Sequence, residues 1–305
     1  MPVRELESGD GPALRRLWDD LGGWYRNTSP TSDNDVDRAI ARLLRHSAGG
    51  LLRRRATPAE GAWVAVTNGV PVGWLYARAD EEQSYILPLL PPDDSTGNFD
   101  ALLLPAKEWF LRQGARRCVV DVPGERVDLR RVVQREGRIL WHRAVFDRDL
   151  APLAGTPALP STTRGFQRSD LSSVQALFAR RHPEPTPPAI PVAFLELRGG
   201  WFRDPAWELQ RAIWVAGPRM DILGVAGANH RPRSPIGFLG PWALSERASL
   251  PVIHDLLSVA LGWVRGVGGE RVRTTVPTPL NDDARALQAA GFSVLAESDL
   301  YELRA

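Results

Sequence analysis

The sequence has few of the residues that form cross-links or bind metals. Its 305 residues include one cysteine, Cys118, which excludes an internal disulfide and any cysteine-based zinc site. Cys118 begins an apolar run within a predicted strand, so we expect a core residue. No two histidines have the i, i+4 spacing of a helix or the i, i+2 spacing of a strand, so we expect no metal; they are His46, His142, His182, His230 and His254.

Long apolar runs are also missing. No run approaches the roughly 18 residues of a membrane span, and residues 1–20 lack the apolar core of a signal peptide. We therefore expect a cytoplasmic protein without a membrane partner.

Lysine is nearly absent, since Lys107 is the single one. The pI is near 9.0 but the net charge is only +2, and nearly every base is arginine, which indicates coding bias rather than a nucleic-acid surface. The densest basic run, residues 53–55, is expected to be a solvated loop or helix end, with a phosphate-binding patch as the alternative. Hydrophobic residues make up 43% and charged residues 24%, as in a globular chain.

The chain contains an internal repeat. Residues 84–146 and 238–300 match without a gap at an offset of 154, as from Trp109 to Trp263. An apolar stripe at helical spacing recurs within the repeat. We therefore predict two copies of one domain, at 1–150 and 162–305, joined by a proline-rich linker at 151–161. Further matched positions are Gly114 with Gly268, Asp128 with Asp282, Gln134 with Gln288 and Gly137 with Gly291.

Each half is predicted to be an α/β domain with a mixed sheet and the order β-α-α-β-β-β-α-β-α-β. In the first half, Asn68-Gly69 between two apolar runs predicts a hairpin. Pro105 is expected to kink or shorten the helix that contains it. The expected strands of the second half include 165–167, 212–216, 222–228 and 236–244.

This element order resembles the GNAT superfamily of acyl-CoA N-acyltransferases over almost the whole chain. The hairpin Gly-Val-Pro-Val-Gly-Trp at 69–74 and the run Asn-Asp-Asp-Ala-Arg-Ala-Leu-Gln-Ala-Ala-Gly-Phe at 281–292 carry the resemblance. The first half keeps only Gly137 of the second motif. The resemblance implies a tandem member that uses acetyl-CoA or another acyl-CoA, without a metal, to acylate an amine of a small molecule or peptide. A homodimer is left open.

In this family, backbone amides after the fourth strand hold the pyrophosphate, because a helix N-terminus favours anions and glycines allow close approach. The first half has Asp93 and Asp94 there, and like charges oppose phosphate. The second half has no glycine in this loop but offers an arginine and a serine. The resemblance therefore implies a cofactor site in the second half, formed by Leu244, Arg247, Ala248, Ser249, Leu250 and Asn281.

The catalytic groups of the family are weakly matched. Glutamines 134 and 288 stand near the position of the family's tyrosine and cannot act as a general acid. Glu246 is the candidate base of the second half, and Glu81 and Glu82 those of the first; a solvated turn residue is favoured for each. Asn281 could instead cap its helix.

The tryptophans Trp109 and Trp263 are expected to pack in the core. Others, Trp24, Trp201, Trp207 and Trp242, lie nearer the loops that surround the acceptor in the family. The sequence thus favours an N-acyltransferase whose second half binds the cofactor. The alternative is an inactive protein of the same fold that binds a ligand or a partner, in which the cleft between the fourth and fifth strands is filled.

Overall fold

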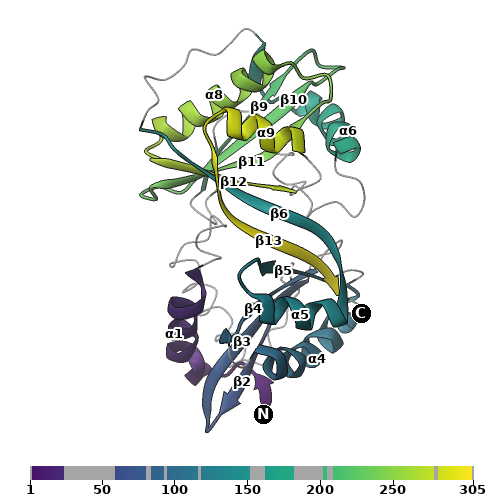
Figure 1. The fold of residues 1–305 in the computed structure, drawn as a ribbon, viewed down its shortest axis with the longest axis vertical. Coiled ribbons are helices and arrows are strands. Elements are labelled where there is room, and N and C mark those ends of the chain that lie inside the picture. The colour runs from purple at the N-terminus through teal and green to yellow at the C-terminus, as the bar shows by residue number, and fades with distance from the viewer. Residues whose placement is uncertain are drawn as a thin grey trace. The chain divides into compact units, whose positions relative to one another are not determined.

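A computed structural model describes residues 2–23, 59–79, 84–92, 95–115, 118–151, 162–181, 202–204, 209–277 and 281–303. The chain forms two compact units (Figure 1). Unit 1 comprises Met1–His142 and Glu297–Ala305, and unit 2 comprises Arg143–Ala296. Among the helices that the structure describes, none is long and apolar enough to cross a membrane.

Unit 1 is a sheet with helices on both faces. Its sheet order is β1-β2-β3-β4-β5-β13. Asn68 and Gly69 have φ angles of 50° and 78°, which confirms the predicted Asn-Gly turn between β2 and β3. The elements are β1 (Val3–Glu5), α1 (Gly11–Leu21), β2 (Ala59–Thr67), β3 (Val70–Ala79), β4 (Ser84–Leu89), α4 (Ser95–Gln113), β5 (Cys118–Pro123), α5 (Val127–Glu136), the start of β6 (Gly137–Asp149) and the end of β13 (Ser293–Leu303).

Alternating strand residues of unit 1 pack against different helices. Val64 and Trp74 face α1, whereas Ala65 and Leu75 face α4 and α5. This alternation follows from the period-two geometry of strands. Figure 1 shows α1 on one side of these strands and α4 with α5 on the other. Cys118 is buried among the residues that face α4 and α5, as predicted, and burial raises the pKa of its thiol.

Unit 2 repeats this architecture. Its sheet order is β6-β12-β11-β10-β9-β7, and β8 also pairs with β9. Helix α6 covers the face that includes Val215 and Ala243, and α8 and α9 cover the face that includes Trp214 and Val272. The elements are β7 (Thr163–Gly165), α6 (Leu171–Arg181), β8 (Phe202–Asp204), β9 (Leu209–Ala216), β10 (Gly224–His230), β11 (Ile236–Leu244), α8 (Leu250–Gly266), β12 (Arg271–Pro277) and α9 (Asn281–Ala289).

Each unit contains the last strand of the other half of the sequence. Residues 143–149 of β6, from the first half, pair with β12 in unit 2. Residues 298–303 of β13, from the second half, pair with β5 in unit 1. The boundaries predicted from the repeat therefore differ from those of the compact units, because the halves exchange their last strands.

Most predicted elements are present, but some differ in extent, and β8 has no predicted counterpart. Helix α4 continues through Pro105 to Gln113, so the expected shortening is wrong. The strand expected at 165–167 lies at Thr163–Gly165, and the strand expected at 222–228 lies at Gly224–His230. The second helix of the predicted element order, expected near 35–44 in the first half and at 192–197 in the second, lies outside the described residues. The basic run 53–55 also lies outside them.

Candidate functional site

The parallel strands in the middle of each sheet separate after a short paired stretch. In unit 1, β4 and β5 pair only from Ser84↔Cys118 to Ile86↔Val120, although β4 continues to Leu89. In unit 2, β11 and β12 pair only from Ile236↔Arg271 to Phe238↔Arg273, although β11 continues to Leu244. Ligands of open α/β sheets bind beyond the carboxyl ends of strands where neighbours separate. Both units thus have the backbone arrangement for a site at this place.

A β-bulge distinguishes β11 from its counterpart β4. Ala226 pairs with Trp242 and Ala228 with Leu239, so two residues of β11 oppose one of β10. The two residues are Gly240 and Pro241, which oppose Gly227, and proline suits a bulge because it cannot donate to the ladder. Asn229 Nδ2 donates to the Gly240 carbonyl at 2.9 Å. In unit 1, β3 and β4 pair in continuous register from Trp74↔Leu89 to Ala79↔Ser84.

The turn after β11 holds most of the residues predicted to bind the cofactor. Leu244 is buried at the end of β11, and Ser249 is the N-cap of α8. The N–H of Arg247 donates to Ser245 Oγ at 3.3 Å, and that of Ala248 donates to the Ser245 carbonyl at 2.9 Å. These two amides are therefore engaged within the turn.

Other predicted side chains of this turn face solvent. Leu250 is 74% exposed, so it does not fill the space between β11 and β12. Glu246 is exposed in the turn itself. Arg247 forms an exposed ion pair with Asp221, which is a competing partner for the guanidinium that was expected to hold phosphate.

The remaining candidates are placed differently. Asn281 is the first residue of α9, but its side chain lies outside the described part of the structure. Trp242 is buried in the core cluster of α8 and α9. Trp24, Trp201 and Trp207 lie outside the described residues, as do Glu81, Glu82, Asp93 and Asp94.

The repeated tryptophans are packing residues, as predicted. Trp109 meets Trp63 edge to face at 5.9 Å between ring centroids, and Trp263 meets Trp214 in the same way at 6.1 Å. Each pair joins a helix to a strand of the same unit. The same contact therefore occurs twice and is part of the core.

Tyr301, which the sequence analysis does not single out, contacts Gln134 in unit 1. Gln134 Nε2 donates to the Tyr301 hydroxyl at 3.2 Å. Burial is the main cause that raises the pKa of Tyr301, which is 1% exposed. Tyr301 lies on β13, so its sequence position in the second half concealed its place in unit 1.

An ion pair in unit 2 was also missed. Arg181 at the end of α6 donates to Asp283 Oδ1 of α9 at 3.1 Å. The Asp283 side chain is 1% exposed, and burial raises the pKa of this carboxyl to about 6. In the sequence Asp283 is only the second aspartate after Asn281, and no spacing links it to Arg181, about a hundred residues earlier.

Comparisons with known proteins identify the fold. A scan against models of protein families and a search of curated protein sequences gave no match. A GCN5-related N-acetyltransferase from Sphaerobacter thermophilus has a similar structure, with a TM-score of 0.60 at 17% identity, over 99% of this chain and 94% of that one.

Two further structures agree. A tandem GNAT protein from the clavulanic acid biosynthesis pathway has a TM-score of 0.58 at 14% identity, over 99% of this chain and 97% of that one. A GCN5-related N-acetyltransferase from Kribbella flavida has a TM-score of 0.53 at 14% identity, over 87% and 95%. Together with the two similar units, these likenesses show that the chain has the fold of the GCN5-related N-acetyltransferases, in a tandem arrangement.

Proposed function

We propose that the protein is an acyl-CoA-dependent N-acyltransferase and that unit 2 holds the acyl-CoA. The observation that carries this proposal is the separation of β11 from β12 after three residue pairs, next to a bulge in β11. Unit 1 shares the separation of its strands but has no shift of register between β3 and β4 over the residues described. The difference favours unit 2 as the working copy.

The start of α8 would hold the pyrophosphate. The first residues of a helix have N–H groups without a partner within the helix, and the positive end of the helix dipole favours anions. In α8 the N–H groups of Leu250 and Val252 are in this position, whereas Pro251 has none. Arg247 would add a positive charge after leaving Asp221.

The reaction would be direct transfer. The neutral nitrogen of the acceptor amine attacks the thioester carbonyl carbon, a C–N bond forms, and the C–S bond breaks. A backbone N–H of the bulge, from Gly240 or Trp242, would polarise the carbonyl and stabilise the oxyanion that develops there. The proton that the nitrogen loses after its attack passes to the thiolate.

A second candidate function is an inactive protein that binds a ligand or partner with the same fold. It is favoured by the engaged amides of Arg247 and Ala248 and by the ion pair between Arg247 and Asp221. Under this alternative, the turn after β11 is closed to phosphate.

Calorimetric titration with acetyl-CoA separates the two functions. We expect micromolar binding to the wild type, a loss of at least tenfold in affinity for Arg247→Glu, and tighter binding for Asp221→Ala, which releases Arg247. The absence of binding to both the wild type and Asp221→Ala would support the inactive protein.

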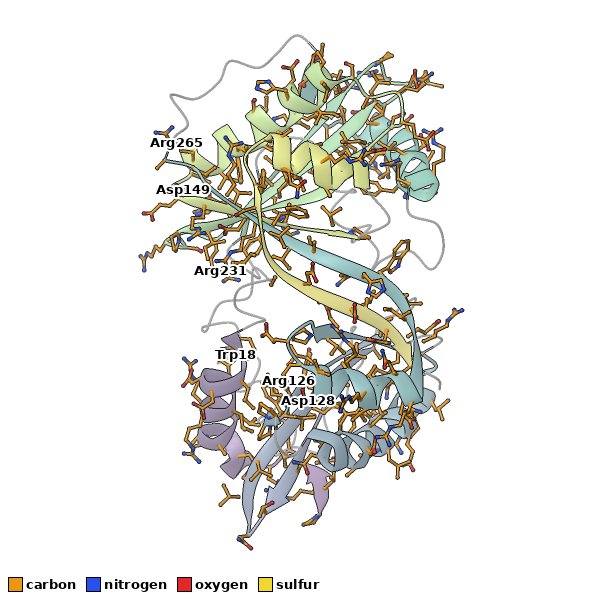
Figure 2. The ribbon with its side chains drawn as sticks, in the orientation of Figure 1. Trp18, Arg126, Asp128, Asp149, Arg231 and Arg265 are labelled. Carbon is orange, nitrogen blue, oxygen red and sulfur yellow. The ribbon has the colours of Figure 1, made fainter. Side chains whose placement is uncertain are left out.

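Arg265→Glu is the matched control for this titration. It makes the same charge change as Arg247→Glu, but near the C-terminal end of α8 rather than in the turn before it (Figure 2). At 1.5 Å per residue it lies about 20 Å from the first turn, beyond a Debye length at 0.15 M salt. Unchanged affinity for this variant would tie the loss in Arg247→Glu to the turn and not to net charge.

A further inference from the structure

The ion pair between Arg181 and Asp283 joins helices that lie on opposite faces of the sheet of unit 2. Helix α6 packs with Val215 and Ala243 on one face, whereas Leu287 of α9 belongs to the core cluster on the other. A side-chain contact between the two faces passes either through an interruption of the sheet or beyond the ends of its strands. The separation of β11 from β12 is an interruption of this kind, and Figure 1 draws α6 beside one end of α9.

The sequence places Asp283 close to this opening. Helix α9 follows β12, and Asp283 is the third residue of the helix. The carboxylate therefore lies just beyond the carboxyl end of β12, past the point where β12 leaves β11. This is the place where a bound thioester would meet its acceptor in the proposed function.

In the part of the chain that the structure describes, only one of the two oxygens of the Asp283 carboxylate has a hydrogen-bond partner. Arg181 contacts Oδ1, whereas Oδ2 is buried and has no hydrogen-bond partner among the described residues. A buried carboxylate oxygen without a partner is costly, and native structures contain few such groups without a functional reason. Nε of Arg181 is likewise buried and unpartnered within the described chain.

We propose that Asp283 Oδ2 binds the ammonium group of the acceptor amine and accepts its proton before transfer. This inference rests on the proposed function and assigns a residue of α9 to hold the acceptor, which for this contact is cationic at neutral pH. A carboxylate oxygen and an ammonium form a charge-assisted hydrogen bond, which is about twice as strong as a neutral one.

The proton balance of this step is complete. The ammonium R–NH3+ gives one proton to the carboxylate, which leaves neutral R–NH2 and a neutral Asp283. After the nitrogen has attacked the thioester, its second proton goes to the thiolate, and Asp283 returns its proton to water. A carboxyl that titrates at about pH 6 is ionised at neutral pH and remains a usable base.

The charged neighbours of Asp283 set the pH at which it binds a cation. Arg181 of α6 favours the ionised form, whereas burial and Asp282 of its own helix oppose it. Binding of an ammonium should strengthen as the pH rises through about 6 and then level off. Removing Arg181 should move this midpoint upward.

The test measures binding of n-butylamine to the intact protein through the shift that it causes in the melting temperature, at several pH values from 5 to 8. The neutral control ligand is 1-butanol, which has a similar shape. We expect a shift with butylamine only, and at least tenfold weaker binding in Asp283→Asn. Asp282→Asn changes an exposed carboxylate of the same turn, and at pH 7.5, where Asp283 is ionised in both proteins, it should bind as the wild type does. Because acetyl-CoA is absent, this result is independent of whether the protein binds acyl-CoA.

Equal binding to the wild type and Asp283→Asn, or no binding of butylamine to the wild type, would overturn the proposal. If Asp283→Asn does not fold, Arg181→Met carries the test, because a purely structural ion pair would not move the pH midpoint of amine binding. An unmoved midpoint in that variant would also contradict the proposal. A positive result without any heat from acetyl-CoA would retain the amine site and reject the transferase.

Discussion

Two carboxylates at equivalent places of the two halves fix the starts of α1 and α6. Arg4 contacts both oxygens of Asp10 at 2.7 and 2.8 Å, and Arg164 contacts both oxygens of Asp170 at the same distances. Each aspartate also accepts a backbone N–H three residues earlier, from Glu7 and Gln167, at 2.8 Å. The repeated clamp extends the internal symmetry to the first strand of each half, where the residues match at an offset of 160 rather than 154.

Asp170→Asn should destabilise unit 2. The substitution removes the charge that pairs with Arg164, and the Asp170 side chain is fully buried. Because Arg164 is 32% exposed, we expect a loss of about 2 to 3 kcal/mol, below the range for fully buried pairs. Urea unfolding measures this loss of stability. An unchanged urea midpoint would contradict a stabilising role for the pair of Arg164 and Asp170.

The effect of Asp170 also depends on pH. Burial alone would raise the pKa of Asp170, but the hydrogen bonds from Arg164 and Gln167 outweigh it and lower the pKa. The stabilisation is therefore present above the ordinary carboxyl pKa and is lost as the pH falls through the lowered value. The wild type and Asp170→Asn should approach each other in stability only in acid.

Asp283 should have the opposite pH dependence. Its pKa is raised from 3.8 to about 6, so its contribution is fully present below pH 3.8 and is lost as the pH rises through about 6. At about 1.4 kcal/mol for each pKa unit, the loss is about 3 kcal/mol at most. Unfolding of the wild type and Asp283→Asn at pH 5 and 7.5 should show the variant gaining relative to the wild type at the higher pH. A constant difference would show that the carboxyl titrates normally.

At the scale of elements, ion pairs hold the exchanged strands in each unit. In unit 2, Asp147 of β6 lies directly opposite Arg273 of β12 and contacts its Nε at 2.9 Å, and Arg271 adds a second contact. In unit 1, Glu302 of β13 accepts from Arg138 at 2.7 Å, and Arg130 Nε of α5 lies 2.8 Å from Asp299 Oδ2 of β13. Charges therefore accompany the apolar contacts at both docking positions.

Asp147→Asn should weaken the docking of β6 on β12. Two arginines would lose their shared carboxylate, and Arg273 is buried. Breaking such a pair costs about 3 to 5 kcal/mol. Hydrogen exchange of residues 143–149 should accelerate, while that of β2 and β3 in unit 1 serves as the control. Equal protection of residues 143–149 in the variant would contradict this role.

Local sequence patterns predicted most elements but not the partner of the last strand. Asn68-Gly69, the apolar stripe of α4 and α8, and the tryptophans Trp109 and Trp263 all depend on neighbours in sequence or on the repeat. Gly137 begins the last strand of the first half and Gly291 lies just before that of the second half, and no local pattern tells which sheet either strand completes. The shortening expected at Pro105 is wrong because tertiary packing can hold a helix together past a proline.

The candidate site was predicted only in part, because local patterns indicate its turn but not its long-range contacts. The turn after Leu244 could be located because it follows a strand and precedes a helix in the resemblance. The contacts of Arg181 with Asp283 and of Gln134 with Tyr301 join residues far apart in the sequence, and no spacing rule indicates them.

At the scale of the whole molecule, the exchange determines which fragments can fold. Unit 2 is the continuous segment 143–296, whereas unit 1 needs residues from both ends of the chain. A fragment of residues 143–296 contains every strand that pairs in unit 2. A fragment of residues 151–305, cut at the end of the first sequence half, lacks the β6 residues that pair with β12.

The fragment of residues 143–296 should therefore fold cooperatively, and the fragment of residues 151–305 should be less stable or unfolded. Both can be compared by circular dichroism and thermal melting at matched concentration. If the fragment of residues 151–305 were the more stable, β6 would not be required in unit 2.

The central claim is that unit 2 binds acyl-CoA at the end of β11, and hydrogen exchange with and without acetyl-CoA tests it most directly. We predict slower exchange in residues 240–253, which include the bulge and the first turn of α8, and no change in the equivalent residues 86–99 of unit 1. Protection confined to residues 86–99, or no protection in either segment at saturating acetyl-CoA, would contradict the account.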